Sequence, residues 1–294
     1  MHRLTAGLVA AAALVAGPAR AATLELRDMV ARVTVIPEDR PDIRVEFVTR
    51  NPSLPITVKI TPGRAILDGG LDRKIRACRS ADGRRGVSVS GLGDVPWQAM
   101  PQIVVRTPRA FVLFAGGAVF GSIGRTASLD LSNAGCGDWT AGNVDGLLKV
   151  SQAGSGDARI GASRAAKLRI AGSGDILAGP VAGPLDAEIG GSGDISATSV
   201  AGDLEVRVAG SGDVRVPTGR APVMNVAIAG SGDVTFGGIA GALKARITGS
   251  GEVRVRKVDG PVEKRVMGSG RVRIGAGPGA GEAVIPPRQR RSGA

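Results

Sequence analysis

The hydrophobic pattern alternates with a period of two over much of the C-terminal two thirds of the chain. From Leu204 to Val216, Leu, Val and Gly occupy every second position, and Glu, Arg, Ala, Ser and Asp fill the positions between them. The same alternation runs from Leu168 to Ile176 and from Val226 to Phe236. Successive side chains of a β-strand point to opposite faces, so this pattern predicts strands with one apolar face.

A four-residue phrase, Gly-Ser-Gly-Asp, interrupts these strands at regular intervals. The phrase and its variants begin at Gly135, Gly154, Gly172, Gly191, Gly210, Gly230, Gly249 and Gly268, with 18 to 20 residues between starts. A second turn, such as Val181-Ala182-Gly183-Pro184-Leu185, completes most repeats. A fixed period of this length is typical of a solenoid, whose coils bury their apolar faces against their neighbours. The sequence therefore predicts an all-β fold, a parallel β-helix with about 19 residues per coil.

The phrase is expected to form a tight corner in each coil. Its two glycines are in phase with the apolar positions, so they are predicted to point inward, where a side chain would collide with the opposite wall or with closely approaching backbone. The Ser and Asp are then expected to face outward or to form the corner itself. The corner residues of the complete copies are Gly154, Gly156, Asp157, Gly172, Gly174, Asp175, Gly191, Gly193, Asp194, Gly210, Gly212, Asp213, Gly230, Gly232 and Asp233.

After the first 21 residues, the sequence divides into three predicted parts. Residues 22–85 alternate like strands but lack the phrase, and we interpret them as a β cap for the open N-terminal end of the solenoid. Residues 86–274 form the solenoid, in which 91–94 and 115–118 are interpreted as degenerate coils, the former followed by an insertion at 96–101. The Gly-, Pro- and Arg-rich residues 275–294 are predicted to be a disordered basic tail.

The first 21 residues predict export. Arg3 precedes an apolar run from Leu4 to Ala16, and Ala19-Arg20-Ala21 is a small-x-small cleavage site, which together are typical of a signal peptide. No later stretch approaches the ~20 apolar residues that a membrane-spanning helix requires. We therefore expect a periplasmic or extracellular protein without a membrane-spanning segment.

Composition excludes several kinds of chemistry. The single histidine, His2, lies within the signal, so the mature chain has no histidine for a Ser-His-Asp or Cys-His site or for a metal. Removing Arg3 and Arg20 with the signal lowers the net charge from +12 to +10, which favours anionic partners. Nucleic acid is not expected, because the chain has no Tyr, two Trp and five Phe to stack on bases. No cofactor is expected.

The two cysteines, Cys78 and Cys136, are predicted to form a disulfide after export into an oxidising compartment. A bridge over this sequence separation contributes roughly 4 kcal/mol in the chain-entropy model. The alternative is a free catalytic thiol.

The aspartates at the corners should stack into an acidic row from Asp138 to Asp233, continued by Glu252. One interpretation is calcium binding, since Gly190 to Asp194 is similar to the calcium-binding nonapeptide Gly-Gly-x-Gly-x-Asp. The spacing argues against it, because here Asp follows its Gly directly and returns only once per coil. The favoured interpretation is structural: short Asp side chains hydrogen-bond backbone at a Gly corner. No metal is expected.

The basic segment Arg73, Lys74, Arg76, Arg79, Arg84 and Arg85 lies outside the repeats. It is either a solvated loop or a patch that docks to an anionic envelope polymer or another anionic surface component.

The repeated Ala-Gly-Ser-Gly-Asp-Val, together with Arg106-Thr107-Pro108-Arg109 and the segment Asn133 to Trp139, resembles the bacterial family called "putative auto-transporter adhesin, head GIN domain". The resemblance covers roughly Val87 to Ile274. It implies an exported right-handed β-helix with an adhesive role and provides no catalytic residues to carry over.

Two functions from different classes are consistent with these observations. The leading hypothesis is an exported, non-catalytic β-solenoid that acts as an adhesin or as a structural or interaction protein of the bacterial cell envelope. The alternative is a polysaccharide-acting enzyme on the same scaffold, which would need an irregular groove with converging carboxylates and Arg. Smooth coils with outward Ser and Asp favour the first hypothesis.

Overall fold

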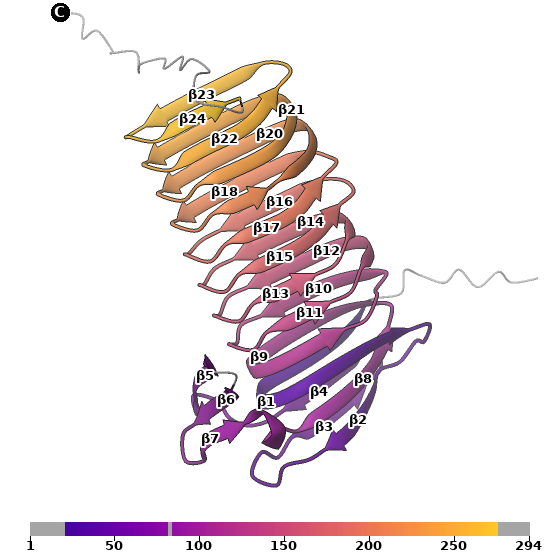
Figure 1. Cartoon of the computed structure of the whole chain (residues 1–294). Coiled ribbons are helices and arrows are strands. Elements are labelled where there is room, and N and C mark those ends of the chain that lie inside the picture. The colour runs from indigo at the N-terminus through magenta and orange to yellow at the C-terminus, as the bar shows by residue number, and fades with distance from the viewer. Residues whose placement is uncertain (1–20, 82–83, 276–294) are drawn as a thin grey trace, which may run out of the picture.

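The computed structural model describes residues 21–81 and 84–275 and shows an elongated stack of coils (Figure 1). The fold is a parallel β-solenoid of about nine turns with about 19 residues per coil, which confirms the predicted fold class. The predicted signal peptide, apart from Ala21, and the predicted tail from residue 276 onward lie outside the described residues. Within the described parts of the chain, no helix is long and apolar enough to cross a membrane.

Each coil contributes one strand before the corner and one after it. We call the strands before the corner the first sheet and those after it the second sheet. The first sheet contains β10 (Ser128–Asn133), β12 (Val144–Gln152), β14 (Ser163–Ile170), β16 (Leu185–Ile189), β18 (Leu204–Gly210), β20 (Thr218–Gly230) and β23 (Val262–Met267). The second sheet contains β11 (Trp139–Ala141), β13 (Ala158–Ile160), β15 (Ile176–Val181), β17 (Ile195–Val200), β19 (Val214–Val216), β22 (Glu252–Val258) and β24 (Arg271–Ile274).

Among the long strands, β9 (Ala110–Ile123) and β21 (Val234–Gly249) contribute to both sheets, and β20 also pairs with β17 through Thr218 and Gly219. The first half of β9 pairs with β10 and its second half with β11, while β21 pairs with β19 and β22 through one half and with β20 and β23 through the other. The backbone N–H groups of Ala134 and Cys136 donate to Ala115 and Gly117 of β9 at 2.9 and 3.0 Å. The predicted coil at 115–118 is therefore confirmed.

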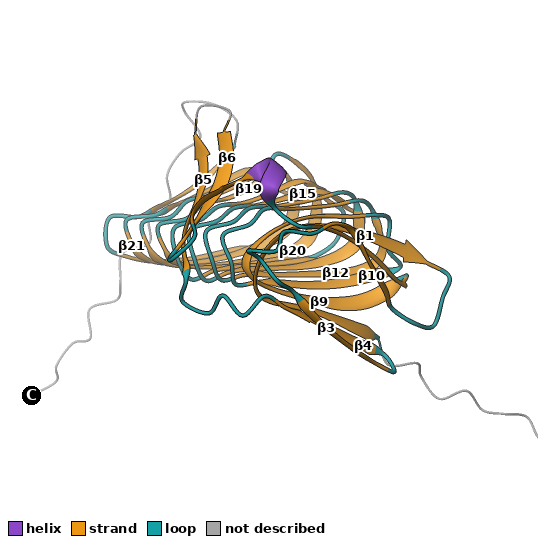
Figure 2. Cartoon of the chain, turned by 90° about the horizontal axis from the view of Figure 1, so that it is seen from below, coloured by secondary structure: helices purple, strands orange, loops and turns teal. Residues whose placement is uncertain are grey.

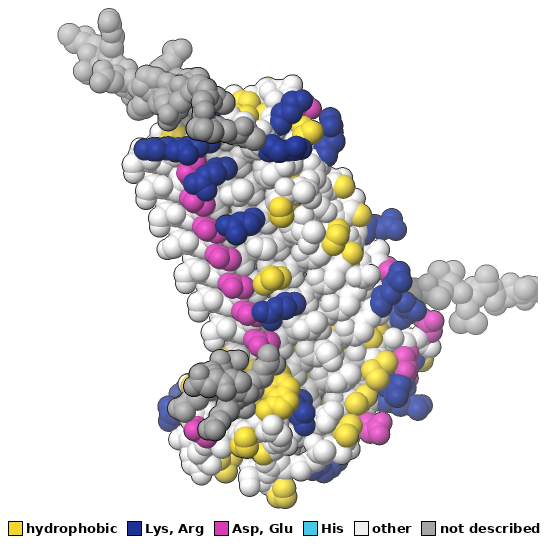
Figure 3. All heavy atoms as spheres, in the orientation of Figure 1, with side chains coloured by type: hydrophobic (Ala, Val, Ile, Leu, Met, Phe, Trp, Pro, Cys, Tyr) yellow, Lys and Arg dark blue, Asp and Glu magenta, His cyan; other side chains and the backbone are white. Residues whose placement is uncertain are grey.

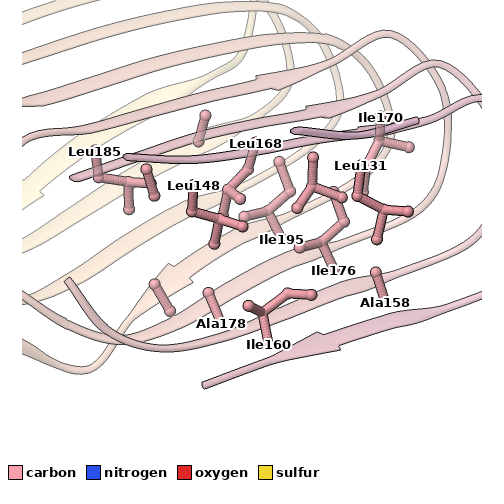
Figure 4. Close-up of a cluster of buried hydrophobic side chains, with 14 of the residues drawn as sticks. Leu131, Leu148, Ala158, Ile160, Leu168, Ile170, Ile176, Ala178, Leu185 and Ile195 are labelled. Atoms are coloured by element: carbon pink, nitrogen blue, oxygen red, sulfur yellow. The ribbon is translucent and has the colours of Figure 1, made fainter. Parts of the chain in front are cut away.

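The apolar face of the sequence pattern is the interior of the stack. Leu185, Leu204 and Met224 occupy one register row of the first sheet and are at most 1% exposed. Side chains of the first sheet, such as Leu168, meet side chains of the second sheet, such as Ile176, across a narrow core (Figure 4). Each buried Leu or Ile contributes about 1.5–3 kcal/mol, so every coil is stabilised by the coils above and below it.

The N-terminal end of the stack begins with a coil whose edge is covered by antiparallel strands. Strand β1 (Ala22–Glu38) pairs in parallel with β9 on one side, and with β4 (Arg64–Asp68) and β8 (Gln102–Pro108) on the other. Strands β2 (Arg44–Thr49) and β3 (Thr57–Thr61) then pair antiparallel with β8 and β4. This change of direction ends the parallel stacking at that edge.

The interpretation of residues 91–94 as a degenerate coil is wrong. Strands β5 (Ile75–Ala81), β6 (Arg84–Val89) and β7 (Gly93–Pro96) form a separate antiparallel sheet, followed by the 3₁₀ turn η1 (Trp97–Ala99). Its apolar side chains Val87, Val89 and Val95 belong to a second core cluster that includes Val30 and Phe120 of β1 and β9. The outer face of the first coils is apolar here, so the alternating segment covers it instead of joining the stack. Figure 2 shows β5 and β6 projecting from the side of the solenoid.

Candidate functional site

The acidic row of the corners is a continuous chain of hydrogen bonds between coils. The carboxylate Oδ1 of each aspartate accepts from the backbone N–H of the equivalent residue one coil later, at 2.8–3.1 Å. The acceptors are Asp138, Asp157, Asp175, Asp194, Asp213 and Asp233, and the last donor is Glu252. The short Asp side chain thus supplies an acceptor at the corner, where the strand ladder is interrupted.

A second hydrogen bond runs the opposite way at each step. The backbone N–H of Ile195 donates to the carbonyl of Asp213 at 2.9 Å, and that of Ile176 donates to the carbonyl of Asp194 at 2.9 Å. Consecutive corners are therefore joined by one side-chain and one backbone hydrogen bond, of about 1 kcal/mol each. These bonds favour the structural interpretation of the acidic row.

The two corner glycines are required by the neighbouring coil. A Cβ added to Gly210 or Gly212 would overlap the carbonyl oxygen of Gly191 or Gly193 in the coil before it. The second glycine of the phrase is buried and the first is half-buried, while Ser211 is exposed. The sequence offered two reasons for these glycines, collision with the opposite wall and close approach of backbone. The structure supports the second, because the backbone that a Cβ would meet belongs to the adjacent coil.

Arginines compensate part of the charge of the acidic row. Arg159 pairs with Asp157 at 3.4 Å, and Arg254 lies 3.7 Å from Asp233. Hydrogen bonding to Glu252 raises the pKa of Arg254, and the nearby carboxylates act in the same direction. Arg273 also contacts Glu252, at 3.0 Å. Among the described residues, no group of three or more His, Cys, Asp or Glu side chains is arranged to hold a metal ion.

The predicted disulfide is present. Cys78 of β5 is bonded to Cys136, which replaces the Ser of the phrase in its coil, with a Cα–Cα distance of 5.8 Å. Because the Ser position of the corner is outward-facing, Cys136 can reach the small antiparallel sheet. The bridge attaches that sheet to the side of the solenoid.

The basic segment lies mainly on this small sheet. Arg73, Lys74 and Arg76 are exposed, and Arg73 adopts a positive φ of 55° beside Asp72. The side chains of Arg79, Arg84 and Arg85 lie outside the described residues, although the backbone of Arg79 pairs with Gly86, and that of Arg84 with Ala81. The role of this segment as a docking patch stays a prediction.

A shallow trough beside the acidic row was not predicted. One hollow of about 320 Å³ lies at Arg32, Trp97 and Asp138. A second, of about 580 Å³, continues along the second sheet to Arg215. Both are lined by Thr140 and Arg159, so the two hollows adjoin, and we refer to them together as the trough. Figure 3 shows the acidic row along the stack with basic and hydrophobic side chains next to it.

Part of this trough could have been found from the sequence. The 19-residue period places Thr140, Arg159, Leu177, Ser196 and Arg215 in one outward row, two positions after each corner Asp, and the strand register confirms that alignment. The contribution of Arg32 and Trp97 carries no such signal, because both lie outside the repeats and are brought to the trough by tertiary packing.

The geometry defines a class of protein: a β-solenoid whose corner carboxylates bind the backbone of the next coil. Residues 182–278 match the model of the family described as "Putative auto-transporter adhesin, head GIN domain", which confirms the predicted resemblance over these residues. No curated protein matched the chain in a sequence comparison.

Three solved structures are similar to this chain. A structure described as a putative lipid binding protein from Parabacteroides distasonis is 19% identical, covers 86% of this chain and 92% of its own, and has a TM-score of 0.56. A putative adhesin from the same species is 14% identical, with coverages of 87% and 94% and a TM-score of 0.48. A putative adhesin from Bacteroides fragilis is 15% identical, with coverages of 87% and 93% and a TM-score of 0.45. The first of these shows a common solenoid fold.

Proposed function

We propose that this protein is exported and acts as a non-catalytic adhesive or structural surface of the bacterial cell envelope. The observation that carries the proposal is the use of the corner carboxylates. Each one, from Asp138 to Asp233, binds the backbone of the next coil. The most regular chemical feature of the molecule therefore serves to make a long, stiff stack with a repetitive outer surface.

Two further observations support this proposal. The adhesin-family model matches residues 182–278. The bridge between Cys78 and Cys136 fits an oxidising compartment, in agreement with the signal peptide predicted at residues 1–21.

The polysaccharide-enzyme alternative would require carboxylates that converge on a bound sugar. The trough contains Asp138, but its Oδ1 accepts from the backbone N–H of Asp157 at 3.0 Å. This engagement favours the adhesive function over the enzymatic one.

The test is to express the full chain with a C-terminal tag, fractionate the cells, and measure binding of the purified mature protein to envelope material. We expect the processed protein in the periplasmic or extracellular fraction and saturable retention on envelope fractions. Retention of the protein in the cytoplasm with an intact N-terminus, or absence of envelope binding, would contradict the proposal.

A further inference from the structure

The trough along the second sheet has the features of a binding surface for a linear molecule. It follows the solenoid axis across consecutive coils, from Trp97 and Arg32 at one end to Pro217 at the other. The floor includes Gly161 and Gly179. A Cβ on Gly179 would lie 2.8 Å from the carbonyl carbon of Gly161. Coil stacking itself therefore requires glycine here.

The cations of the trough are spaced along its length. Arg159 and Arg215 occupy the same outward row and are separated by two intervening coils, which contribute Leu177 and Ser196. At the usual strand spacing, the two arginines are about 14 Å apart. Arg159 has an ion pair with Asp157 at 3.4 Å, whereas Arg215 makes no ion pair with any described residue. A ligand that contacts both arginines along this row spans three coil steps, which suits an extended chain.

The side chains between the cations suit a carbohydrate. Thr140, Ser196 and Thr198 line the trough with hydroxyl groups, which can donate to and accept from sugar hydroxyls. Leu177, 43% exposed, offers an apolar surface to the C–H face of a sugar ring.

The end of the trough adds an aromatic side chain and a further cation. The guanidinium of Arg32 lies 5.4 Å from the ring centroid of Trp97, and Phe120 packs edge-on to Trp97 at 5.1 Å. The Nε of Arg32 is buried and has no hydrogen-bond partner among the described residues. The other described contact of this guanidinium is a 3.5 Å hydrogen bond from Nη2 to Gln102.

The acidic row limits the charge density of the ligand. Asp175, Asp194 and Asp213 stand two positions before the outward row of the trough, on its corner side. They would repel a chain with a charge on every unit, because exposed charges interact over about 8 Å at physiological ionic strength. A chain whose carboxylates are separated by uncharged units and meet the arginines reduces this repulsion.

We propose that the trough binds a linear acidic polysaccharide whose carboxylates are separated by uncharged sugars, with its chain parallel to the solenoid axis. Arg159 and Arg215 pair with carboxylates, and the hydroxyl row contacts the sugars between them. This inference rests on the proposed adhesive function and identifies the chemistry of its partner.

The test uses hyaluronan dodecasaccharide, which has one carboxylate per disaccharide, and measures its affinity for the full mature protein by calorimetry. We expect the double variant Arg159→Gln, Arg215→Gln to weaken binding at least tenfold. The matched control is Arg169→Gln, Arg246→Gln, which removes two exposed arginines from the first sheet and should change the affinity less than twofold. The methyl-esterified dodecasaccharide and a hyaluronan disaccharide, which carries a single carboxylate, should each bind at least tenfold more weakly.

The inference is overturned if both double variants weaken binding equally, since that would indicate unspecific charge attraction. It is also overturned if hyaluronan fails to bind at millimolar concentration, or if vesicles of phosphatidylglycerol compete for the trough arginines more strongly than the glycan does. Binding of envelope fractions that survives Arg159→Gln, Arg215→Gln would remove the trough as the adhesive site and leave the proposed function standing. If the protein binds hyaluronan but is not exported, the trough stands as a binding site and the proposed function is contradicted.

Discussion

The carboxylate of Asp194 accepts a hydrogen bond from the backbone N–H of Asp213, 2.8 Å away in the next coil. The same relationship joins Asp175 to Asp194 and Asp213 to Asp233. Each carboxylate in this row of like charges is held in place because its oxygen accepts a backbone hydrogen bond from the next coil. The repulsion between neighbouring carboxylates in water is about 1 kcal/mol, which is similar to the gain from one hydrogen bond.

Two substitutions at Asp194 distinguish the role of its acceptor oxygen from the role of its negative charge. Asp194→Asn keeps an oxygen acceptor for the N–H of Asp213, so we expect a change in unfolding free energy of only a few tenths of a kcal/mol. Asp194→Ala leaves that N–H without its partner and should destabilise the protein by about 1 kcal/mol. Urea denaturation of both variants, with Ser192→Ala as the exposed control, measures the difference. Equal losses for Asn and Ala would show that the charge matters rather than the acceptor.

The corner glycines give a steric prediction. A methyl group at Gly212 would overlap the carbonyl oxygen of Gly193, so Gly212→Ala should destabilise the protein by about 1–3 kcal/mol, as overpacking does. The neighbouring exposed residue provides the control, and Ser211→Ala should leave the melting temperature nearly unchanged. Similar shifts in thermal unfolding for the two variants would refute the assignment of the contact.

Calcium is expected to have no effect on stability. A ligand that binds only the folded state raises stability by mass action, so the melting temperature reports binding directly. We expect the same melting temperature with chelator and with millimolar calcium. A rise of several degrees with calcium, lost in the double variant Asp194→Asn, Asp213→Asn, would restore the metal-binding interpretation.

Acid should destabilise the N-terminal coil through Glu25, which is 7% exposed. Burial alone would raise the pKa of Glu25, but hydrogen bonds and charges from Arg27 and Arg64 outweigh it, so the pKa lies below its ordinary value of 4.5. A carboxyl with a lowered folded-state pKa stabilises the fold above its unfolded pKa, and this contribution is lost as pH falls through the folded value.

The unfolding free energy should therefore decline from about pH 5 downward, and Glu25→Gln should reduce that decline. Denaturation series at fixed pH values between 7 and 3 measure both slopes. Parallel curves for the wild type and the variant would indicate that Glu25 does not contribute to the pH dependence.

The basic segment should bind anionic envelope material weakly and with strong salt dependence. Exposed charges are screened beyond about 8 Å at physiological ionic strength, so moderate salt should release the protein. Changing Arg73, Lys74, Arg76, Arg79, Arg84 and Arg85 to Ser should abolish this salt-sensitive component in a sedimentation assay with envelope fractions. Persistent binding in high salt would assign the interaction to another surface, such as the trough.

The alternating pattern of residues such as Leu204, Val206 and Val208 determined by itself that the chain forms strands with one apolar face, and the return of Gly-Ser-Gly-Asp determined the length of a coil. These features are readable because each coil contacts only its neighbours, so the information for one coil is contained in one repeat. The pairing of Cys78 with Cys136 was equally predictable, because they are the chain's two cysteines.

Tertiary structure decided the features that depend on contacts between non-equivalent segments. Val87 and Val89 alternate like coil residues but pack against Val30 and Phe120. The outer face of the first coils is apolar there, so the segment is more stable when it covers that face than when it adds a coil to the stack. The same docking brings Trp97 against Arg32 and so completes the trough. Such contacts follow no period in the sequence. They depend on which exposed apolar and charged surfaces remain once the coils have stacked.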